Sequence, residues 1–186
     1  MTRTRKALVS AVVLSAFSTV SLAALQATGE LVGTPMGGGV YHYTLTIHNT
    51  GTTTIGSLWF AWIPGENFMT AAATSVTSPA NWAGAHQGGA GADSVLWQAN
   101  SAAARIAVGG TLTGFAFNST QTPAQMAALS PNDTRYHMTD SYVYSAGAFS
   151  DGGFLFTITV TPTPSAAAAL GLASTAMLRR RTRSHT

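Results

Sequence analysis

Residues 40–48 have the sequence VYHYTLTIH, in which apolar and polar side chains alternate at almost every position. In an extended chain one face would carry the apolar members, Tyr41, Tyr43, Leu45 and Ile47. A period of two predicts a β-strand that buries one face. The next residues, Asn49-Thr50-Gly51, are typical of a turn because asparagine and glycine tolerate positive φ angles.

The same alternation recurs along the chain. Residues 55–63 place Leu58, Phe60 and Trp62 on one face, and residues 154–160 form the last clear strand. Shorter strands are predicted at residues 94–98, 104–108, 111–117 and 141–144. Because turn residues separate these segments and helices do not alternate with them, the pattern predicts a mainly β protein. We expect an antiparallel β-sandwich of jelly-roll or immunoglobulin-like topology.

One short helix is predicted. Thr122 is a suitable N-cap, Pro123 occupies the first helical position, and Gln125 completes a capping box. The helix should run to about Leu129, before Pro131. Two glycine-rich stretches, residues 36–39 and 84–91, are expected to be flexible loops.

The N-terminus has the organisation of a signal peptide. Arg3, Arg5 and Lys6 precede an apolar run over residues 7–20, and Ser21-Leu22-Ala23 provides a small-x-small cleavage pattern. The run is shorter than the roughly 20 apolar residues that a membrane span needs. We therefore expect residues 1–23 to be removed by signal peptidase, with cleavage near Ala23 or Ala24.

The C-terminus carries a second distinct segment. Prolines in residues 161–165 (TPTPS) are expected to end the last strand, since proline cannot donate to a sheet ladder. A run of small and apolar residues, 166–178, and an arginine cluster follow. This order resembles the PEP-CTERM sorting signal of exported bacterial proteins, with threonine where that family usually has glutamate. The sorting-motif residues would be Pro162, Thr163, Pro164, Arg179, Arg180 and Arg181.

The resemblance implies recognition by an exosortase, a membrane transpeptidase-like enzyme, after transient insertion of the tail into the membrane. Many members of that family are linked with extracellular polysaccharide. We therefore expect three parts: a signal helix at residues 1–23, a β-sandwich domain at residues 24–160, and a helical sorting tail at residues 161–186. The expected location is the cell surface or the extracellular space.

Charge is distributed unevenly along the chain. The net charge is +3, but seven of the nine basic residues lie in the two terminal segments. Residues 24–160 contain two arginines and six acidic residues, which gives 2 − 6 = −4. Such a domain cannot neutralise many phosphates, so nucleic-acid binding is excluded. The chain contains no cysteine, which excludes disulfides, thiol redox chemistry and zinc–thiolate sites.

Sequence motifs for catalysis are lacking. No phosphate-binding loop, nucleophile elbow or His-Glu-x-x-His motif is present. Asp133, His137 and Asp140 supply ligand types for a hard cation, but their spacing fits a solvated loop better. Glu66 and Asp93 are the central carboxylates, and nothing in the sequence brings them together. We therefore predict no catalytic residue, no metal and no cofactor, and a protein that is not an enzyme.

Large aromatic side chains are the most suggestive feature of the central segment. Trp59 and Trp62 are three residues apart, so on one straight strand they would face opposite sides. If Trp62 joins the core, Trp59 faces outward. Trp59 and Trp82 are thus candidates for stacking on sugar rings, with packing beneath a loop as the alternative.

Three functions remain after these exclusions. The leading hypothesis is an exported, non-enzymatic β-sandwich that serves as a structural or adhesive component of the extracellular polysaccharide matrix. The second is a carbohydrate-binding module that uses exposed aromatic rings, and the third is a secreted hydrolase. Burial of Trp59 and Trp82 in the core would argue against carbohydrate binding through them.

Overall fold

The computed structural model describes residues 24–163. The strands are β1 (Ala27–Gly37), β2 (Val40–Asn49), β3 (Ser57–Phe60), β4 (Trp62–Ile63), β5 (Glu66–Asn67), β6 (Thr74–Thr77), β7 (Trp82–His86), β8 (Val95–Ala99), β9 (Thr111–Ser119), β10 (Asp140–Tyr144), β11 (Phe154–Thr157) and β12 (Thr159–Pro162). A 3-10 turn, η1, covers Ala102–Ala104, and the helix α1 covers Pro123–Met126.

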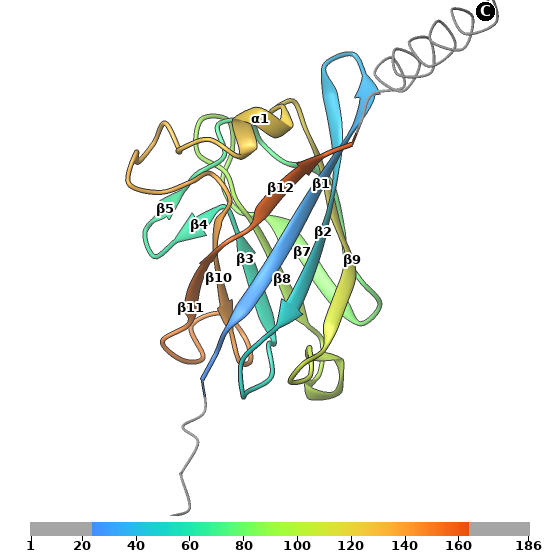
Figure 1. The fold of residues 1–186 in the computed structure, drawn as a ribbon, viewed down its shortest axis with the longest axis vertical. Helices are drawn as coiled ribbons and strands as arrows, with labels where there is room; N and C mark the ends of the chain where they lie inside the picture. Colours follow the sequence, from blue (N-terminus) through green and yellow to red (C-terminus); the bar gives the residue numbers. More distant parts are fainter. Residues whose placement is uncertain (1–23, 164–186) are drawn as a thin grey trace, which may run out of the picture.

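Two five-stranded sheets pack face to face (Figure 1). The first has the order β12-β1-β2-β9-β6, the second has the order β11-β10-β3-β8-β7, and β4 and β5 form a separate hairpin. The neighbouring strands are antiparallel except for β1 and β12, which run parallel. The mainly β sandwich is confirmed, and the parallel pair is a departure from the purely antiparallel arrangement that the sequence suggests.

The core lies between the inner faces of the two sheets. The alternation in β2 is confirmed, because Tyr43, Leu45 and Ile47 are fully buried. Aromatic rings join the layers: Phe117 of β9 lies 5.2 Å from Phe60 of β3, between ring centroids. Burying such aromatic and aliphatic surface is the main force that holds the sheets together.

The first strand, β1, was not anticipated from the sequence. It pairs with β2 along almost its whole length, although Gly29 and Gly33 occupy two of its inward positions. A Cβ atom on Gly29 would lie 2.9 Å from the Ile158 side chain, and one on Gly33 would lie 2.7 Å from the Tyr43 ring. Close packing therefore requires glycine at these points. Because glycine has no apolar side chain, the alternation that would predict a strand is missing from the sequence here.

Two predictions in the second half of the sandwich were wrong. Residues 104–108 do not form a strand, since Ile106 makes only an isolated bridge to Ile55 and η1 precedes it. The expected loop at residues 84–91 begins later, because β7 continues to His86 and pairs with β8. Gly84 permits this pairing, as a Cβ there would lie 2.2 Å from the Trp97 ring.

The predicted last strand is divided between the sheets. Buried Ile158 separates β11 in the second sheet from β12 in the first. Contrary to expectation, Pro162 takes part in the ladder and pairs with Gly33. Because β12 is an edge strand, it tolerates a residue without an N–H. The N–H of the next residue, Thr163, donates to the Gly33 carbonyl. Since successive backbone nitrogens point to opposite sides of a strand, the nitrogen of Pro162 faces away from β1.

The helix begins as predicted and ends early. The Thr122 side chain accepts a hydrogen bond from the Gln125 backbone, and the Gln125 side chain accepts one from the Thr122 N–H. Met126 is the last helical residue, three residues short of the expected end. Within residues 24–163 no helix has the length and apolarity to cross a membrane. The predicted signal helix and the helical part of the predicted tail lie outside the described residues.

Candidate functional site

Ala61 determines where the two neighbouring tryptophans point. Its φ angle of 56° lies in the left-handed region, and it separates β3 from β4. The alternation of side chains therefore stops at Ala61. The indole rings of Trp59 and Trp62 stack with a centroid distance of 3.8 Å and an interplanar angle of 6°. The prediction that they face opposite sides was wrong, because it assumed an unbroken strand.

Three further rings extend this pair into one aromatic cluster. Phe149 makes edge-to-face contacts with Trp59 and Trp62, both at 5.6 Å. Tyr142 meets the edge of Trp62 at 5.8 Å, and Tyr144 contacts both Tyr142 and Phe149. We call these five residues the aromatic surface. It lies outside the second sheet, on the side away from the core.

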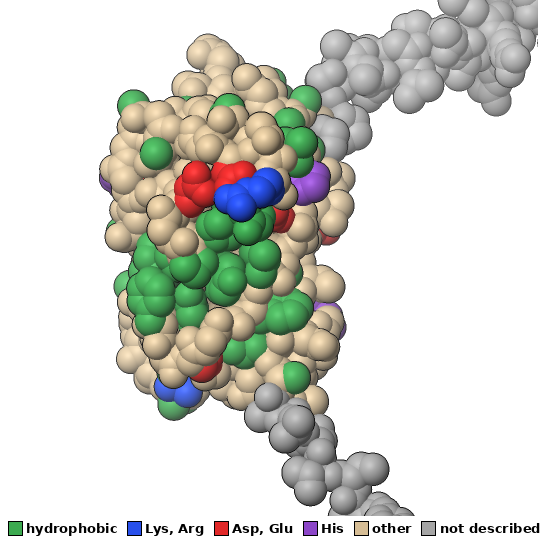
Figure 2. Space-filling model, turned by 90° about the vertical axis from the view of Figure 1, so that its left-hand side faces the viewer, with side chains coloured by type: hydrophobic (Ala, Val, Ile, Leu, Met, Phe, Trp, Pro, Cys, Tyr) green, Lys and Arg blue, Asp and Glu red, His purple; other side chains and the backbone are tan. Residues whose placement is uncertain are grey.

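The aromatic surface is partly open to solvent. Phe149 is 64% exposed, whereas Trp62 is 5% exposed beneath its neighbours. Figure 2 shows hydrophobic side chains gathered on the side of the domain that carries β4, β5, β10 and β11, with charged side chains at the margin. Contiguous exposed apolar surface on a soluble domain is a common mark of a binding site.

A short loop, residues 145–153, holds Phe149 in place. The Asp151 carboxylate accepts hydrogen bonds from the Ser145 N–H at 2.9 Å, from the Ser145 hydroxyl, and from the Gly153 N–H at 2.8 Å. Burial raises the pKa of this carboxyl, but the hydrogen bonds outweigh it and bring the pKa below its ordinary value of 3.8. The ionised carboxylate thus fixes the loop that carries the exposed ring.

An apolar row crosses the whole outer face of the second sheet. Trp59 is paired in register with Tyr142 of β10 and with Leu96 of β8. Tyr142 is in turn paired with Leu155 of β11, and Leu96 with Ala85 of β7. We call this the cross-strand row: Leu155, Tyr142, Trp59, Leu96 and Ala85. Each of the five side chains is at least partly exposed.

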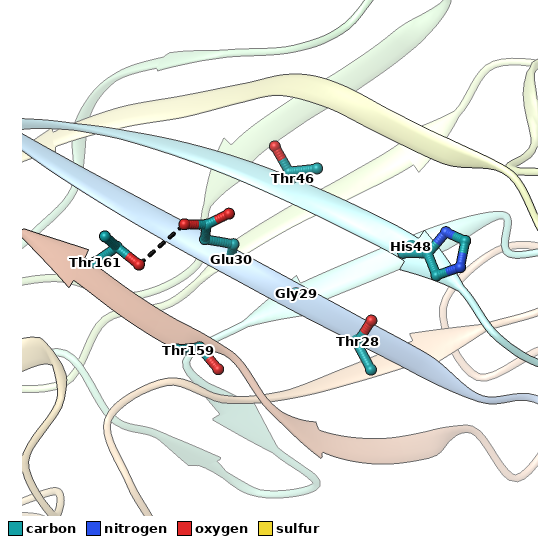
Figure 3. Close-up of a pocket in the computed structure, with 7 residues that line it drawn as sticks. All are labelled: Thr28, Gly29, Glu30, Thr46, His48, Thr159 and Thr161. Atoms are coloured by element: carbon teal, nitrogen blue, oxygen red, sulfur yellow. Dashed lines mark hydrogen bonds between the residues drawn. The ribbon is translucent and has the colours of Figure 1, made fainter.

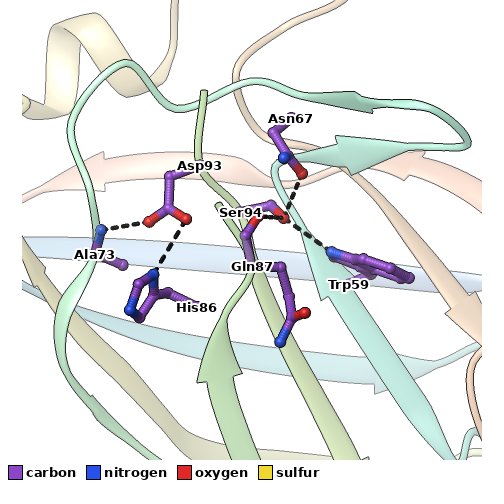
Figure 4. Close-up of polar contacts among 7 residues, drawn as sticks. All are labelled: Trp59, Asn67, Ala73, His86, Gln87, Asp93 and Ser94. Atoms are coloured by element: carbon purple, nitrogen blue, oxygen red, sulfur yellow. Dashed lines mark hydrogen bonds and ion pairs between the residues drawn. The ribbon is translucent and has the colours of Figure 1, made fainter. Parts of the chain in front are cut away.

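Polar groups line one side of the row near Trp59. The Trp59 indole donates to the Ser94 hydroxyl at 2.9 Å, and that hydroxyl donates to the Asn67 side chain at 2.7 Å (Figure 4). The side chain of Gln87 points away from this network in the same view. Ser94 is fully buried, so on this side the group left for a ligand is the amide of half-buried Gln87. An apolar strip with amides beside it is suited to a ligand with an apolar face and polar edges.

The second tryptophan proposed for sugar stacking lies elsewhere. Trp82 is only 5% exposed and packs edge to face on the core residue Phe115 at 5.2 Å. Its indole donates to the Ala104 carbonyl at 2.9 Å. The ring therefore has no free face, and Trp82 serves the core, whereas half-buried Trp59 lies on the outer face.

The candidate carboxylates have structural partners. Asp93 is fully buried, accepts the Ala73 N–H at 2.6 Å and lies 3.4 Å from the His86 ring nitrogen. The half-buried Glu66 lies in the small β4–β5 hairpin. Among the described residues, Asp93 and Glu66 do not face each other across a cleft. The buried Asp93 instead anchors the loop that contains Ala73.

At the possible cation site, residues 133–140, the two aspartates bind other groups of the domain. Asp133 binds Arg135, and hydrogen bonds from this arginine lower the pKa of Asp133 to about 2. Asp140 accepts hydrogen bonds from the His137 N–H at 2.9 Å and from the Thr157 hydroxyl at 2.5 Å. Within residues 24–163 no group of three histidines or acids is arranged to hold a metal ion.

The histidines of β2 lie on the outer face of the first sheet. His42 bonds to Asn118 and His48 bonds to Thr111, each at 2.8 Å. His48 also borders a shallow groove of about 370 Å³ between β1, β2 and β12 (Figure 3). Glu30 lies there and accepts a hydrogen bond from the Thr161 hydroxyl at 2.9 Å. The groove is polar, and it lies on the opposite sheet from the aromatic surface.

The predicted sorting motif begins inside the folded domain. Pro162 ends β12, and the Thr163 hydroxyl lies 3.2 Å from that of Thr34 in β1. Pro164 and the arginines at positions 179, 180 and 181 lie outside the described residues. The chain thus leaves the sheet in the middle of the Pro-Thr-Pro sequence.

No family model and no curated protein sequence matches this chain. Among solved structures it resembles a GH20 exo-β-N-acetylglucosaminidase from Vibrio harveyi in complex with N-acetylglucosamine, at 14% identity and a TM-score of 0.40, over 73% of this chain and 18% of the enzyme. An uncharacterised protein from Nocardia farcinica with an immunoglobulin-like fold gives 12% identity and a TM-score of 0.41, over 70% and 98% of the two chains.

A CBM3 of Hungateiclostridium clariflavum gives 13% identity and a TM-score of 0.36, over 73% of this chain and 99% of that one. This chain therefore spans less than a fifth of the Vibrio enzyme and nearly the full length of the other two. At such low scores these likenesses show nothing about the activity of this chain.

Sequence reasoning found Trp59 but missed Phe149 and the cross-strand row. Phe149 stands alone in a polar loop, where nothing in the sequence pairs it with distant tryptophans. The row depends on the register of five strands, of which β7 was not predicted. Alternation within 94–98 and 154–160 was the available signal, since it marks Leu96 and Leu155 as outward-facing.

Proposed function

We propose that this chain is an exported, non-enzymatic β-sandwich that binds extracellular polysaccharide through the aromatic surface. The observation that carries the proposal is the placement of exposed Phe149 against the Trp59–Trp62 stack, outside the sheet and away from the core. Rings in this position add little to the core. They offer an apolar contact to the flat faces of sugar rings, with side-chain amides beside them.

The surrounding residues support binding rather than catalysis. Hydrolysis of a glycosidic bond requires two carboxyl groups on either side of the bond. Asp93 is enclosed in the domain, and Asp151 is held by its own loop. A secreted hydrolase therefore ranks third.

Export and a role in the matrix rest on the two terminal segments. The signal-peptide pattern and the PEP-CTERM-like tail support delivery to the cell surface, where a polysaccharide-binding domain would act as an adhesive component. A purely structural component without a ligand is the alternative. Signal peptidase and an exosortase would be the processing partners.

The binding proposal is tested on a glycan array. The protein from Ala24 onward is compared with the variants Trp59→Ala and Phe149→Ala. We expect both to lose about tenfold or more in affinity for any glycan that the parent binds, which corresponds to about 1.4 kcal/mol. Leu129→Ala is the matched control, because Leu129 is also an exposed apolar residue but lies outside the aromatic surface. Equal binding by all four proteins, or none by the parent, contradicts the proposal.

The sorting proposal has a separate test. Deletion of residues 164–183 removes Pro164, the apolar run and the arginine cluster of the predicted tail without touching β12. We expect the truncated protein to change its distribution between cell surface and medium, measured by fractionation and immunoblotting. An unchanged distribution would count against the sorting signal and leave the binding proposal intact.

A further inference from the structure

The cross-strand row has a length and a direction that restrict its ligand. Its five residues lie on five adjacent strands, so it spans four interstrand steps of about 4.8 Å, or about 19 Å. Directly paired residues lie side by side, so the row runs across the strands rather than along them. A ligand that contacts Leu155, Trp59 and Ala85 together must be extended over this distance.

Both long sides of the row carry hydrogen-bonding groups. On one side Gln87 lies two residues beyond Ala85, and its N–H donates to the carbonyl of the fully buried Ser94 at 2.8 Å. On the other side Gln98 is paired with Ser57 and Ala83. The side chains of Gln87 and Gln98 are half-buried and make no hydrogen bond to the described part of the chain.

This arrangement matches a repeating ligand that is apolar on its face and polar at both edges. A chain of sugar rings has that character, because its C–H groups lie on the faces and its hydroxyls point to the sides. A lipid tail or an apolar surface of a second protein copy would cover the two glutamine amides without giving them partners. Leaving a buried amide without a hydrogen-bond partner costs free energy, which disfavours both alternatives.

Charge restricts the ligand further. The described domain contains two cationic side chains, Arg105 and Arg135, against six carboxyls. The Arg135 guanidinium is already bound to Asp133, with contacts of 2.5 and 3.0 Å. A uronate or sulfate polymer would therefore meet a domain of net charge −4 with one of its two cations engaged.

We propose that the cross-strand row binds a single linear, uncharged polysaccharide that lies across the strands of the second sheet. This inference rests on the proposed function and adds the class and orientation of the ligand. The ends of the row contact only ligands that are long enough to reach them, and charge on the polymer weakens binding.

Matched polymers test the charge requirement. Hydroxyethylcellulose, dextran, pullulan and galactomannan are each compared with their carboxymethyl derivatives by affinity electrophoresis and calorimetry, using the protein from Ala24 onward. We expect at least one neutral polymer to bind and its carboxymethyl derivative to bind about tenfold or more weakly at low salt. The difference should shrink as salt is raised, because screening reduces the repulsion. Equal or tighter binding of the charged derivative overturns the inference while leaving carbohydrate binding intact.

Chain length and the ends of the row provide the second test. With oligosaccharides of the polymer that binds, affinity should rise with length until the ligand spans about 19 Å and then level off. Leu155→Ala and Ala85→Glu change the two ends of the row, on β11 and β7. Both should weaken binding of the long oligosaccharides about threefold to tenfold and leave a disaccharide unaffected.

The outcomes separate the two proposals. Affinity that is already maximal for a disaccharide, or full affinity of both end variants for long chains, overturns the inference alone. Failure of all neutral and charged polymers overturns the proposed function as well. Reversible dimerisation in sedimentation, abolished by Ala85→Glu, would assign the row to a second copy of this chain and also overturn the inference. Leu129→Ala and circular dichroism control for general loss of folding.

Discussion

A single non-glycine residue in the left-handed region decides the orientation of the aromatic surface. Ala61 is fully buried and has a φ of 56°, a conformation that costs an L-residue about 1–2 kcal/mol. The stacking of Trp59 on Trp62 depends on this reversal. Strain of this kind is retained only where surrounding contacts hold it. Here the Ala61 N–H donates to the Ser141 hydroxyl at 3.2 Å, and the Ala61 carbonyl accepts the Phe68 N–H at 2.9 Å.

Two substitutions at Ala61 should therefore differ in their effect on stability. Ala61→Gly relieves the backbone strain but makes the unfolded chain more flexible, so the free energy of unfolding should change by less than about 1 kcal/mol. Ala61→Val adds a β-branched side chain in a buried left-handed position. It should lower the free energy of unfolding by about 2 kcal/mol or more. Urea denaturation measures both, and near-ultraviolet circular dichroism reports the tryptophan pair. Equal stability of the two variants would contradict this role.

Asp151 should make the Phe149 loop sensitive to acid. Its pKa is below 3.8 in the folded protein, so its contribution to stability is present above the unfolded pKa and is lost as pH falls through the lowered value. Tryptophan fluorescence should therefore change in acid, below about pH 4, as Phe149 leaves the indoles. Asp151→Asn should show the open-loop spectrum already at neutral pH. A variant that matches the parent at neutral pH would show that the carboxylate does not hold the loop.

At the scale of the strands and the helix, prediction succeeded where the local pattern matched the local structure. The alternation in β2 and the capping residues of α1 act over a few positions, and both were read correctly from the sequence. The strand β1 was missed because two of its inward positions hold Gly29 and Gly33, which long-range packing requires. Likewise, the division of residues 154–160 at Ile158 depends on two sheets that the local pattern does not distinguish.

The cap of α1 gives a quantitative check at this scale. Thr122→Ala removes the side-chain acceptor of the Gln125 N–H, so the free energy of unfolding should fall by about 1 kcal/mol. Thr120→Ala is a control at an exposed position two residues earlier and should change it by less than about 0.5 kcal/mol. Thermal and urea unfolding measure both. Equal effects would mean that the capping box does not stabilise the domain.

For the whole molecule, sequence reasoning established the class of fold and the separation of charge. Strongly basic ends flank a domain of weak negative charge, and this composition predicts that the domain does not bind nucleic acid. The candidate site was only partly predictable. Trp59 was identified, but Trp82 proved to be a core residue, and Phe149 and the row emerge only when the sheets are assembled.

The indole N–H groups of the tryptophans offer the most direct test of carbohydrate binding on the outer face of the second sheet. The Trp82 and Trp97 indoles donate to backbone carbonyls in the interior, at 2.9 and 2.8 Å, whereas the Trp59 indole donates to Ser94 beside the row. When ¹⁵N-labelled protein is titrated with a neutral polysaccharide that it binds, we predict that the indole resonance of Trp59 shifts while those of Trp82 and Trp97 stay in place. Binding that leaves the Trp59 resonance unmoved would contradict the account.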